Sequence, residues 1–562
     1  MQRFAAFALL DWLILAGYLI GIAVLGLWIG RRVGRTDQYF LGARRFNRWV
    51  MIAQSFASGT HADMPVSLAG AVYSRGFSAI WFQWKNMFAT PFYWLLAPLY
   101  RRMRRTTIAE FFEDRFGHWM GAAYMVFALA FLTINLASML KGAAKVISQA
   151  AGGDIPVNAI VMAMTVAFLL YSFIGGQVAT AWTELVQGFL IIVLSFLLIP
   201  LGWGLAGGIS GIREALGPER LTLTAPEGIG PWFILMLTIN GLIGITSQPH
   251  IMGMVATGKD EAACREGFLY GTFVKRFCTL GWALTGLVAA ALLAKGVFGT
   301  TTLHDAEEAF GFACRHLLFP GGKGLLVACL LAANMAACSA YMVSAGALFT
   351  RNLYGRYLVR DRSDRHYLWA GRISGLAITL LGVLYALFLI DKVLNTFLLT
   401  ETLATYVGIA VLGGIFWRRA NRWGALAGIA AAMTANFAIY SWLGQRFDHW
   451  DPNVFLAALL CGTAVFVLVS LTTPPEPAAV LDEFFERLRT PSHLEPGAAQ
   501  PEEVEREAAR RGEQLLLTHL LHPLRGAAGQ PFWRAYRIDL AGFLSGWAIA
   551  LGMVALAWLI VR

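Results

Sequence analysis

The chain has 562 residues, of which 57% are apolar and 14% are charged, against roughly 45–50% and 25% in an ordinary soluble protein. This excess excludes a soluble enzyme, and because a membrane span takes about 20 apolar residues, the chain has room for many spans. The formal net charge is +11, and the positively charged residues lie in short blocks between apolar runs. This pattern is typical of cytoplasmic loops and not of a nucleic-acid-binding surface. We therefore expect an all-α polytopic membrane protein in the lipid bilayer, with no nucleic-acid partner.

Apolar runs long enough to cross a bilayer follow one another along most of the chain. No small-residue cleavage site follows the run at 9–30, so we expect a retained first span and not a signal peptide. Arginine blocks follow alternate runs, as at 31–45 and 101–105, and the positive-inside rule then places both termini outside. The sequence predicts about 14 transmembrane helices, at 9–30, 47–73, 78–100, 119–148, 156–175, 181–208, 230–256, 266–295, 322–350, 367–390, 396–417, 422–444, 453–472 and 539–560.

The composition changes after the thirteenth run. Residues 473–537 are polar and begin with two prolines after a threonine pair, which indicates a cytoplasmic insert before the last span. We divide the chain into a first span with its loop (1–46), two five-span units (47–208 and 230–417), two further spans (418–472), the insert (473–537) and the last span (538–562).

Two predicted spans contain polar residues where a lipid-facing helix would be apolar. The second includes SFASGTHADMPVSLAG (55–70) and the seventh includes TINGLIGITSQPHIMGMVATGKD (238–260). They hold corresponding positions in the two five-span units, which is typical of an inverted repeat whose broken second and seventh spans bind solute and ion near the midplane. The alternative is a pair of proline kinks stabilised by neighbouring hydroxyl groups.

Four further segments stand in order at predicted junctions or spans: TDQYFLGARR (36–45), TIAEFFEDRFG (107–117), IGGQVATAWTELVQ (174–187) and GLLVACLLAANMAACSAYMVSAGALFTRNLY (324–354). Together they resemble the sodium:solute symporter family, which includes sugar, proline and pantothenate carriers. The resemblance implies a leucine-transporter-type fold on spans two to six and seven to eleven. It also implies alternating access driven by an inward sodium gradient.

The resemblance also implies a cation site formed by backbone carbonyls and a few side chains. Carbonyl oxygens suit a hard cation, and almost any residue can supply one. The family usually carries two adjacent hydroxyl residues in the ninth span, where this chain has alanines, and an aspartate in the sixth span, where it has a glutamate. The implied cation site comprises the carbonyls of Ala57, Thr60 and Ala333 and the positions Ala336, Ala337 and Glu184.

The coupling ion has more than one candidate. Because the two alanines supply no hydroxyl oxygen, proton coupling or uncoupled facilitation stands beside sodium coupling. Intramembrane carboxylates and histidines are the usual proton relays, and the candidates are Asp63, His61 and His250. The alternative for His61 is a hydrogen-bonding role in the broken helix. We expect no cofactor, and no metal other than sodium.

The resemblance to the family's sugar carriers implies that polar residues in the third, seventh and eighth spans bind the solute. Amide side chains flanked by aromatic rings suit a sugar, an amino acid or another small polar solute. Lys275 could bind a carboxylate, or it could anchor its helix at the cytoplasmic face. The predicted binding residues are Gln83, Trp84, Asn86, Asn240 and Lys275, with Glu401 and Thr405 available to line the same cavity.

These features predict a secondary-active transporter of the plasma (inner) membrane that imports a small sugar, amino acid or carboxylate by cation symport. The alternative is a transporter-like membrane sensor or an uncoupled facilitator, suggested by the two alanines and the insert. An enzyme is not expected, because the sequence has no HExxH motif, no GxSxG motif and no phosphate-binding glycine loop.

Overall fold

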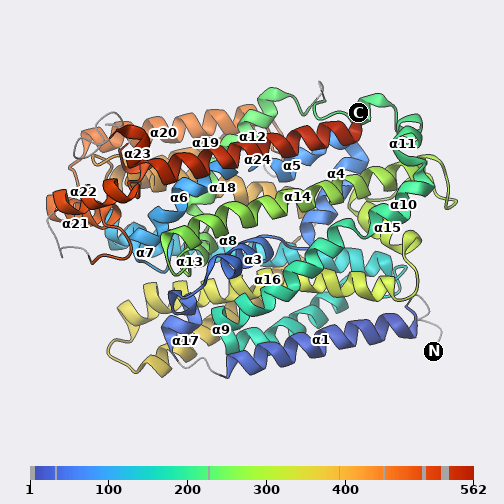
Figure 1. The fold of residues 1–562 in the computed structure, drawn as a ribbon, viewed down its shortest axis with the longest axis horizontal. Coiled ribbons are helices and arrows are strands. Elements are labelled where there is room, and N and C mark those ends of the chain that lie inside the picture. Colours follow the sequence, from blue (N-terminus) through green and yellow to red (C-terminus); the bar gives the residue numbers. More distant parts are fainter. Residues whose placement is uncertain are drawn as a thin grey trace.

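The computed structural model describes residues 7–31, 35–225, 228–390, 393–446, 450–495, 501–519 and 531–562. Helices dominate these ranges, and the β-pairing found there is an isolated bridge between Phe46 and Gly258. The helices form one elongated bundle, with most of them running along its long axis (Figure 1). The expected all-α polytopic architecture is confirmed.

Within the described ranges, ten helical segments are long and apolar enough to span a membrane, or eleven if one bent pair is counted as a span. They differ strongly in burial: the most apolar part of α16 is completely buried, whereas in α1 only 22% of it is. The long helices are α1 (Leu9–Gly30), α8 (His118–Ala150), α9 (Val157–Phe196), α14 (Glu261–Ala294), α16 (Gly322–Leu348), α17 (Asp364–Phe388), α18 (Val393–Phe416), α19 (Arg422–Trp442), α20 (Pro452–Thr472) and α24 (Arg537–Val561).

Shorter helices connect or extend these rods. They are α2 (Thr36–Leu41), α3 (Arg48–Ser58), α4 (Asp63–Arg75), α5 (Trp81–Trp84), α6 (Thr90–Met103), α7 (Ile108–Phe116), α10 (Leu198–Ala206), α11 (Gly208–Leu216), α12 (Pro231–Gly244), α13 (Pro249–Val255), α15 (Ala309–Leu317), α21 (Ala478–Arg489), α22 (Pro501–Arg511) and α23 (Phe532–Ala535).

The expected count of about 14 differs from this set because the predicted second, third and fifth spans are not continuous long rods. The second consists of α3 and α4, and the third of α5 and α6. The fifth and sixth meet within α9 at a kink at Gly176, which has φ 51° and ψ −149°, so the helix breaks next to the predicted boundary between them, and the part before the kink is a shorter apolar helix. A Cβ at Gly176 would lie 2.3 Å from the Tyr39 ring, so only glycine fits this bend.

The break between α3 and α4 is stabilised by side chains from two buried helices. Asn334 of α16 accepts a hydrogen bond from the Ala62 backbone N–H at 3.2 Å and donates one to the Met139 carbonyl at 2.8 Å. Lys275 of α14 donates to the carbonyl of Gly59. Backbone groups that leave the helix are thus satisfied inside the protein, as the membrane interior requires.

The break in the predicted seventh span is sharper. The segments Pro231–Ser247 and Pro249–Val255 meet at 66°, with Gln248 extended at φ −67° and ψ 126°. Proline at 249 disfavours helical geometry in the residue before it. The freed carbonyl of Ser247 accepts a hydrogen bond from Tyr124 at 2.7 Å. Both predicted breaks are therefore unwound segments and not kinks within a continuous helix.

A third break, between α5 and α6, was not predicted. Residues 85–89 form turns, and Pro91 follows in the first turn of α6, where proline is favoured. The predicted span at 78–100 was read as one helix because its aromatic and aliphatic residues are continuous. The turn brings Lys85 and Asn86 to the interior of the bundle.

The insert lies at one end of the bundle, and the start of α1 and the end of α24 lie at the other (Figure 1). Its helix α21 packs on α6 and α7. Arg102 of α6 pairs with Glu261 at 2.9 Å and also donates to the carbonyls of Arg489 and Glu513. The insert is therefore docked on the bundle.

Candidate functional site

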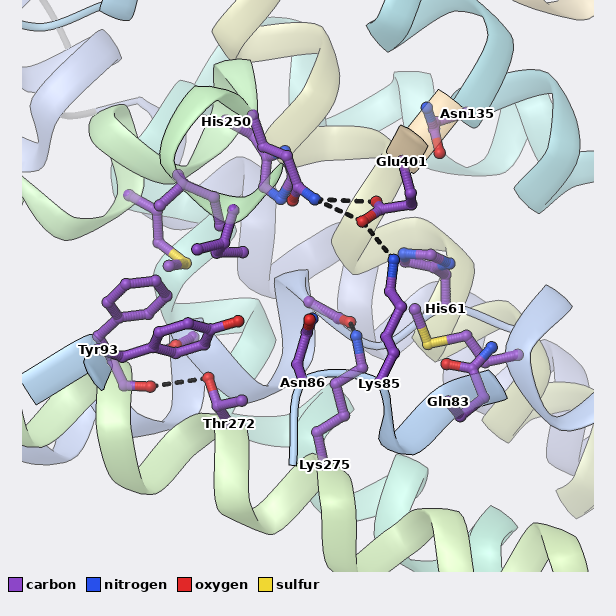
Figure 2. Close-up of a pocket in the computed structure, with 18 of the residues that line it drawn as sticks. His61, Gln83, Lys85, Asn86, Tyr93, Asn135, His250, Thr272, Lys275 and Glu401 are labelled. Carbon is purple, nitrogen blue, oxygen red and sulfur yellow. Dashed lines mark hydrogen bonds and ion pairs between the residues drawn. The ribbon is translucent and has the colours of Figure 1, made fainter. Parts of the chain in front are cut away.

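A small polar cavity lies where the three interrupted helices meet. Its volume is about 60 Å³, which holds a few water molecules, since one needs about 10–15 Å³. The first break contributes Gly59 and His61, and the second contributes Gln248 and His250. Other lining residues come from α5, α14 and α18 and from the turn after α5: Gln83, Lys85, Asn86, Thr272, Lys275, Arg276 and Glu401 (Figure 2).

A buried ion pair crosses this cavity. Lys85 Nζ lies 2.5 Å from Glu401 Oε2, and the ammonium group also lies 4.7 Å from the centre of the Phe397 ring. Gln248 Nε2 donates to both carboxylate oxygens of Glu401, at 2.9 and 2.8 Å. Lys85 and Glu401 therefore compensate each other's charge (Figure 2). Gln248 connects the pair to the second break.

Sequence reasoning did not identify Lys85 as a site residue and gave Glu401 no specific role. The signal that could have found them is a lysine and a glutamate in two predicted apolar spans, because such charges inside a membrane protein usually face one another or a cavity.

Two further cations line the cavity without an acidic partner among the described residues. Lys275 donates to the backbone carbonyl of Gly59 in the first break. Arg276 donates to the carbonyl of Gln83 at 2.5 Å. Both partners are neutral, so neither positive charge is compensated by an ion pair.

The candidate proton-coupling residues lie beside the same cavity. His61 Nδ1 lies 2.5 Å from Asp63 Oδ1, and of these two only His61 is among the lining residues. His250 also lines the cavity, and its ring centre lies 4.7 Å from that of Tyr341. Its Nδ1 has no hydrogen-bond partner in the part of the chain that is described.

The structure brings three of the five candidate solute-binding residues together. Gln83, Asn86 and Lys275 line the cavity. Trp84 and Asn240 are not among its lining residues: Trp84 Nε1 donates to the Arg276 carbonyl at 3.0 Å, and Asn240 donates to Thr402 Oγ1 at 3.1 Å. Both side chains connect helices.

The candidate cation-site positions are divided between the first break and α16. Ala57 and Thr60 flank the break, where the Ala57 carbonyl accepts a hydrogen bond from the Thr60 N–H at 3.2 Å. Ala333, Ala336 and Ala337 are completely buried on α16, which packs against α3. Over the described ranges, no group of three or more His, Cys, Asp or Glu side chains could hold a metal ion.

Glu184 is separate from the cavity. It lies in α9, completely buried, in a helix that packs against α1, α3 and α16. Neither of its carboxylate oxygens has a hydrogen-bond partner within the described residues. Leaving a carboxylate buried and unpaired is costly, which makes it a candidate for binding a cation or a proton.

Comparison with known proteins identifies the family. The profile of the sodium:solute symporter family matches residues 39–431. The osmoregulated proline transporter OpuE of Bacillus subtilis is 27% identical over 475 residues, covering 81% of this chain and 93% of the relative. The sodium/proline symporter of Haemophilus influenzae is 24% identical, covering 83% and 95%, and the sodium/glucose cotransporter of Vibrio parahaemolyticus is 23% identical, covering 83% and 90%.

Solved structures share the fold. A substrate-bound, outward-open Na⁺-coupled sialic acid symporter superposes with a TM-score of 0.71 at 17% identity, covering 84% of this chain and 99% of that one. A nucleobase-cation-symport-1 family transporter in a closed conformation gives 0.54 at 15% identity, covering 80% and 98%. The expected leucine-transporter-type fold is thereby confirmed, and the chain belongs to the sodium:solute symporter family.

Proposed function

We propose that this chain imports a small sugar, amino acid or carboxylate together with sodium across the plasma membrane. Its family membership makes it a secondary-active symporter. Relatives of similar length are named for sodium-coupled transport of proline and of glucose, which supports both the coupling ion and the size of the solute.

The observation that carries the proposal is the polar cavity between the two broken helices. Glycine and histidine from the first break face glutamine and histidine from the second. Unwound segments at the middle of a bundle expose backbone carbonyls and helix ends to solute and ion, and both sides can then move around a fixed site. We assign the breaks to the two five-span units at 47–208 and 230–417.

The proposed sodium site uses the carbonyls of Ala57, Thr60 and Ala333. Three carbonyls are fewer oxygens than a hard cation prefers, and Ala336 and Ala337 add none. We therefore propose that water completes the ligand set and that Glu184, in the adjoining helix α9, supplies the compensating negative charge. Proton coupling through the His61–Asp63 pair is the second candidate, supported by the contact of 2.5 Å between them.

We also propose the orientation that the arginine blocks predict, with the insert in the cytoplasm and both termini outside. The placement of α21 and α22 at the opposite end of the bundle from the start of α1 and the end of α24 supports it (Figure 1).

The test is uptake into proteoliposomes that contain the purified full chain. Radiolabelled proline, glucose and lactate are offered under an inward sodium gradient or an inward proton gradient, each imposed separately. We expect the sodium gradient to drive accumulation of at least one solute, and a sodium ionophore to abolish it.

Three other outcomes would each contradict the proposal. Uptake driven by the proton gradient alone and lost in Asp63→Asn would favour proton coupling. Exchange without accumulation would indicate a facilitator. Neither transport nor binding of any solute in the panel would favour a sensor.

A further inference from the structure

The cavity holds more positive than negative side chains. Lys85, Lys275 and Arg276 line it, against one carboxylate, that of Glu401. Asp63 contacts His61 and does not itself line the cavity, so the number of acidic groups near the cavity is at most two. At least one positive charge thus has no acidic partner among the residues that the structure describes, and an uncompensated charge inside the membrane is costly.

Lys275 and Arg276 both end on neutral carbonyls, and of the two we assign the solute contact to Lys275, because its partner, Gly59, lies in the first break. The Lys85 ammonium is satisfied by Glu401, and the Arg276 guanidinium donates to the Gln83 carbonyl on one wall. Lys275 rises from α14 between Asn86 and Lys85 (Figure 2) and ends on the neutral carbonyl of Gly59. A negatively charged solute can form an ion pair with this ammonium group without breaking an existing ion pair.

Five polar atoms of residues that line the cavity have no hydrogen-bond partner in the described ranges. They are Ser55 Oγ, Asn86 Oδ1, the Tyr93 hydroxyl, His250 Nδ1 and Arg276 Nε, and all five residues are at most 7% exposed. Unpartnered buried polar atoms are rare in proteins, and at a binding site they are the groups that a ligand satisfies. An acceptor such as Asn86 Oδ1 suits a hydroxyl group on the solute.

We propose, on the basis of the proposed symport function, that the solute is a small 2-hydroxy monocarboxylate and that Lys275 couples its binding to that of the cation. The solute carboxylate receives the ammonium group of Lys275, and its hydroxyl group bonds to Asn86. A neutral sugar would leave the excess charge uncompensated. A zwitterionic amino acid would bring a new ammonium group, while the cavity's carboxylate is already bonded to Lys85 and Gln248.

The coupling follows from where Lys275 ends. Gly59 directly precedes Thr60, whose carbonyl belongs to the proposed sodium site, so an ammonium group on Gly59 repels a cation there. When the solute carboxylate pairs with Lys275, the ammonium group leaves the Gly59 carbonyl and its charge is compensated. The electrostatic repulsion of a sodium ion beside Gly59 is then removed. By linkage, sodium then tightens solute binding by the same factor.

The experiment measures binding of radiolabelled lactate to the purified full chain, with sodium or choline as the cation at constant ionic strength. We expect sodium to tighten lactate binding by at least about tenfold, within the usual range of coupling between sites. Unlabelled lactate should displace the label, whereas lactamide, its neutral analogue, should not.

Substitutions of Lys275 test the coupling. Lys275→Met should weaken lactate binding by at least about tenfold, the factor that corresponds to one lost charge-assisted contact. Sodium should then protect the variant from thermal unfolding whether or not lactate is present. Lys275→Arg keeps the charge and should retain part of the lactate dependence, while Lys259→Met, a lysine in an exposed loop outside the cavity, controls for loss of a lysine.

Two results would overturn the inference. One is sodium-dependent binding of proline or glucose with no binding of lactate, which would leave the proposed symport function intact. The other is lactate binding that lactamide displaces equally well, which needs no variant to fold. If no solute binds in sodium, the proposed function itself fails.

Discussion

Charged residues inside this bundle are of two kinds, those with an acidic or basic partner and those without one. Arg265 and Asp539 form a buried pair between α14 and α24, and Lys85 and Glu401 form another. Glu184 and Lys275 lack such a partner in the described part of the chain. A paired charge is already compensated within the protein. The unpaired groups are therefore the ones that we expect to bind ions and solutes.

Glu184 gives a prediction at this scale. Glu184→Gln replaces a buried carboxylate by a neutral amide of similar shape, so we expect the sodium-free protein to be stabilised, because an unpaired buried charge costs more than an unpaired buried amide. The same change should abolish the stabilisation that sodium gives. The measurement is the melting temperature in sodium chloride and in choline chloride. A variant that sodium still protects as strongly as it protects the unchanged protein would exclude Glu184 from the cation site.

The sequence predicted some of these residues and not others, for a physical reason. Gln83, Asn86 and Lys275 could be identified because they stand at positions where the resemblance to the family's sugar carriers implies solute contacts. Trp84 and Asn240 lie in the same spans but bond to neighbouring helices. The direction of each side chain depends on the residue at which its helix unwinds, because a shift of one residue along a helix turns a side chain by about 100°. The sequence does not determine at which residue the helix unwinds.

At the scale of helices, the breaks determine the site. Glycine, proline and polar residues predicted the breaks at 59–62 and at Gln248. The break between α5 and α6 was missed because its neighbours are aromatic and aliphatic, so the hydrophobic pattern shows no interruption. The break at Gly176 lies at the predicted boundary between the fifth and sixth spans.

A glycine in α8 allows the first break to pack closely. A Cβ at Gly142 would lie 2.6 Å from Asp63 Cβ, so Gly142→Ala must displace the start of α4 and with it the His61–Asp63 contact. We expect a loss of about 1–3 kcal/mol, as for other overpacked cores, and strongly reduced uptake.

Melting temperature and proteoliposome uptake measure the two effects of this substitution. Gly21→Ala is the matched control, because no atom lies within 4 Å of a Cβ at that position of α1. If Gly142→Ala were to behave like Gly21→Ala, close packing at the break would not be required for transport.

At the scale of the whole molecule, the insert connects several helices at one end of the bundle. Arg102 of α6 joins Glu261 of α14, the carbonyl of Arg489 at the end of α21 and the carbonyl of Glu513 after α22. Asp114 of α7 accepts from Arg105 and from Arg487 of α21, each at 2.6 Å. The sequence predicted the position and polarity of this segment, but not these contacts, because ion pairs between distant segments leave no local pattern.

Arg102 tests whether these contacts hold the insert. Arg102→Ala leaves Glu261 without its buried partner, which typically costs about 3–5 kcal/mol, so the insert should be released more often. We expect trypsin to cleave at Arg487 and Arg489 much faster than in the unchanged protein, as followed by mass spectrometry. Arg511→Ala, which removes an exposed pair with Glu507, should change the cleavage rate little. Equal rates for both variants would show that other contacts dock the insert.

The contrast between the fully buried α16 and the largely exposed α1 has a consequence for the membrane around the protein. Continuous outer rods such as α1 and α24 meet the lipid, while the interrupted helices lie behind them. A thinner or thicker bilayer is therefore accommodated first by tilting of the peripheral rods. The unwound segments in the centre do not contact the lipid, so a difference between bilayer thickness and helix length does not act on them directly. The site therefore keeps its shape in membranes of different lipid composition.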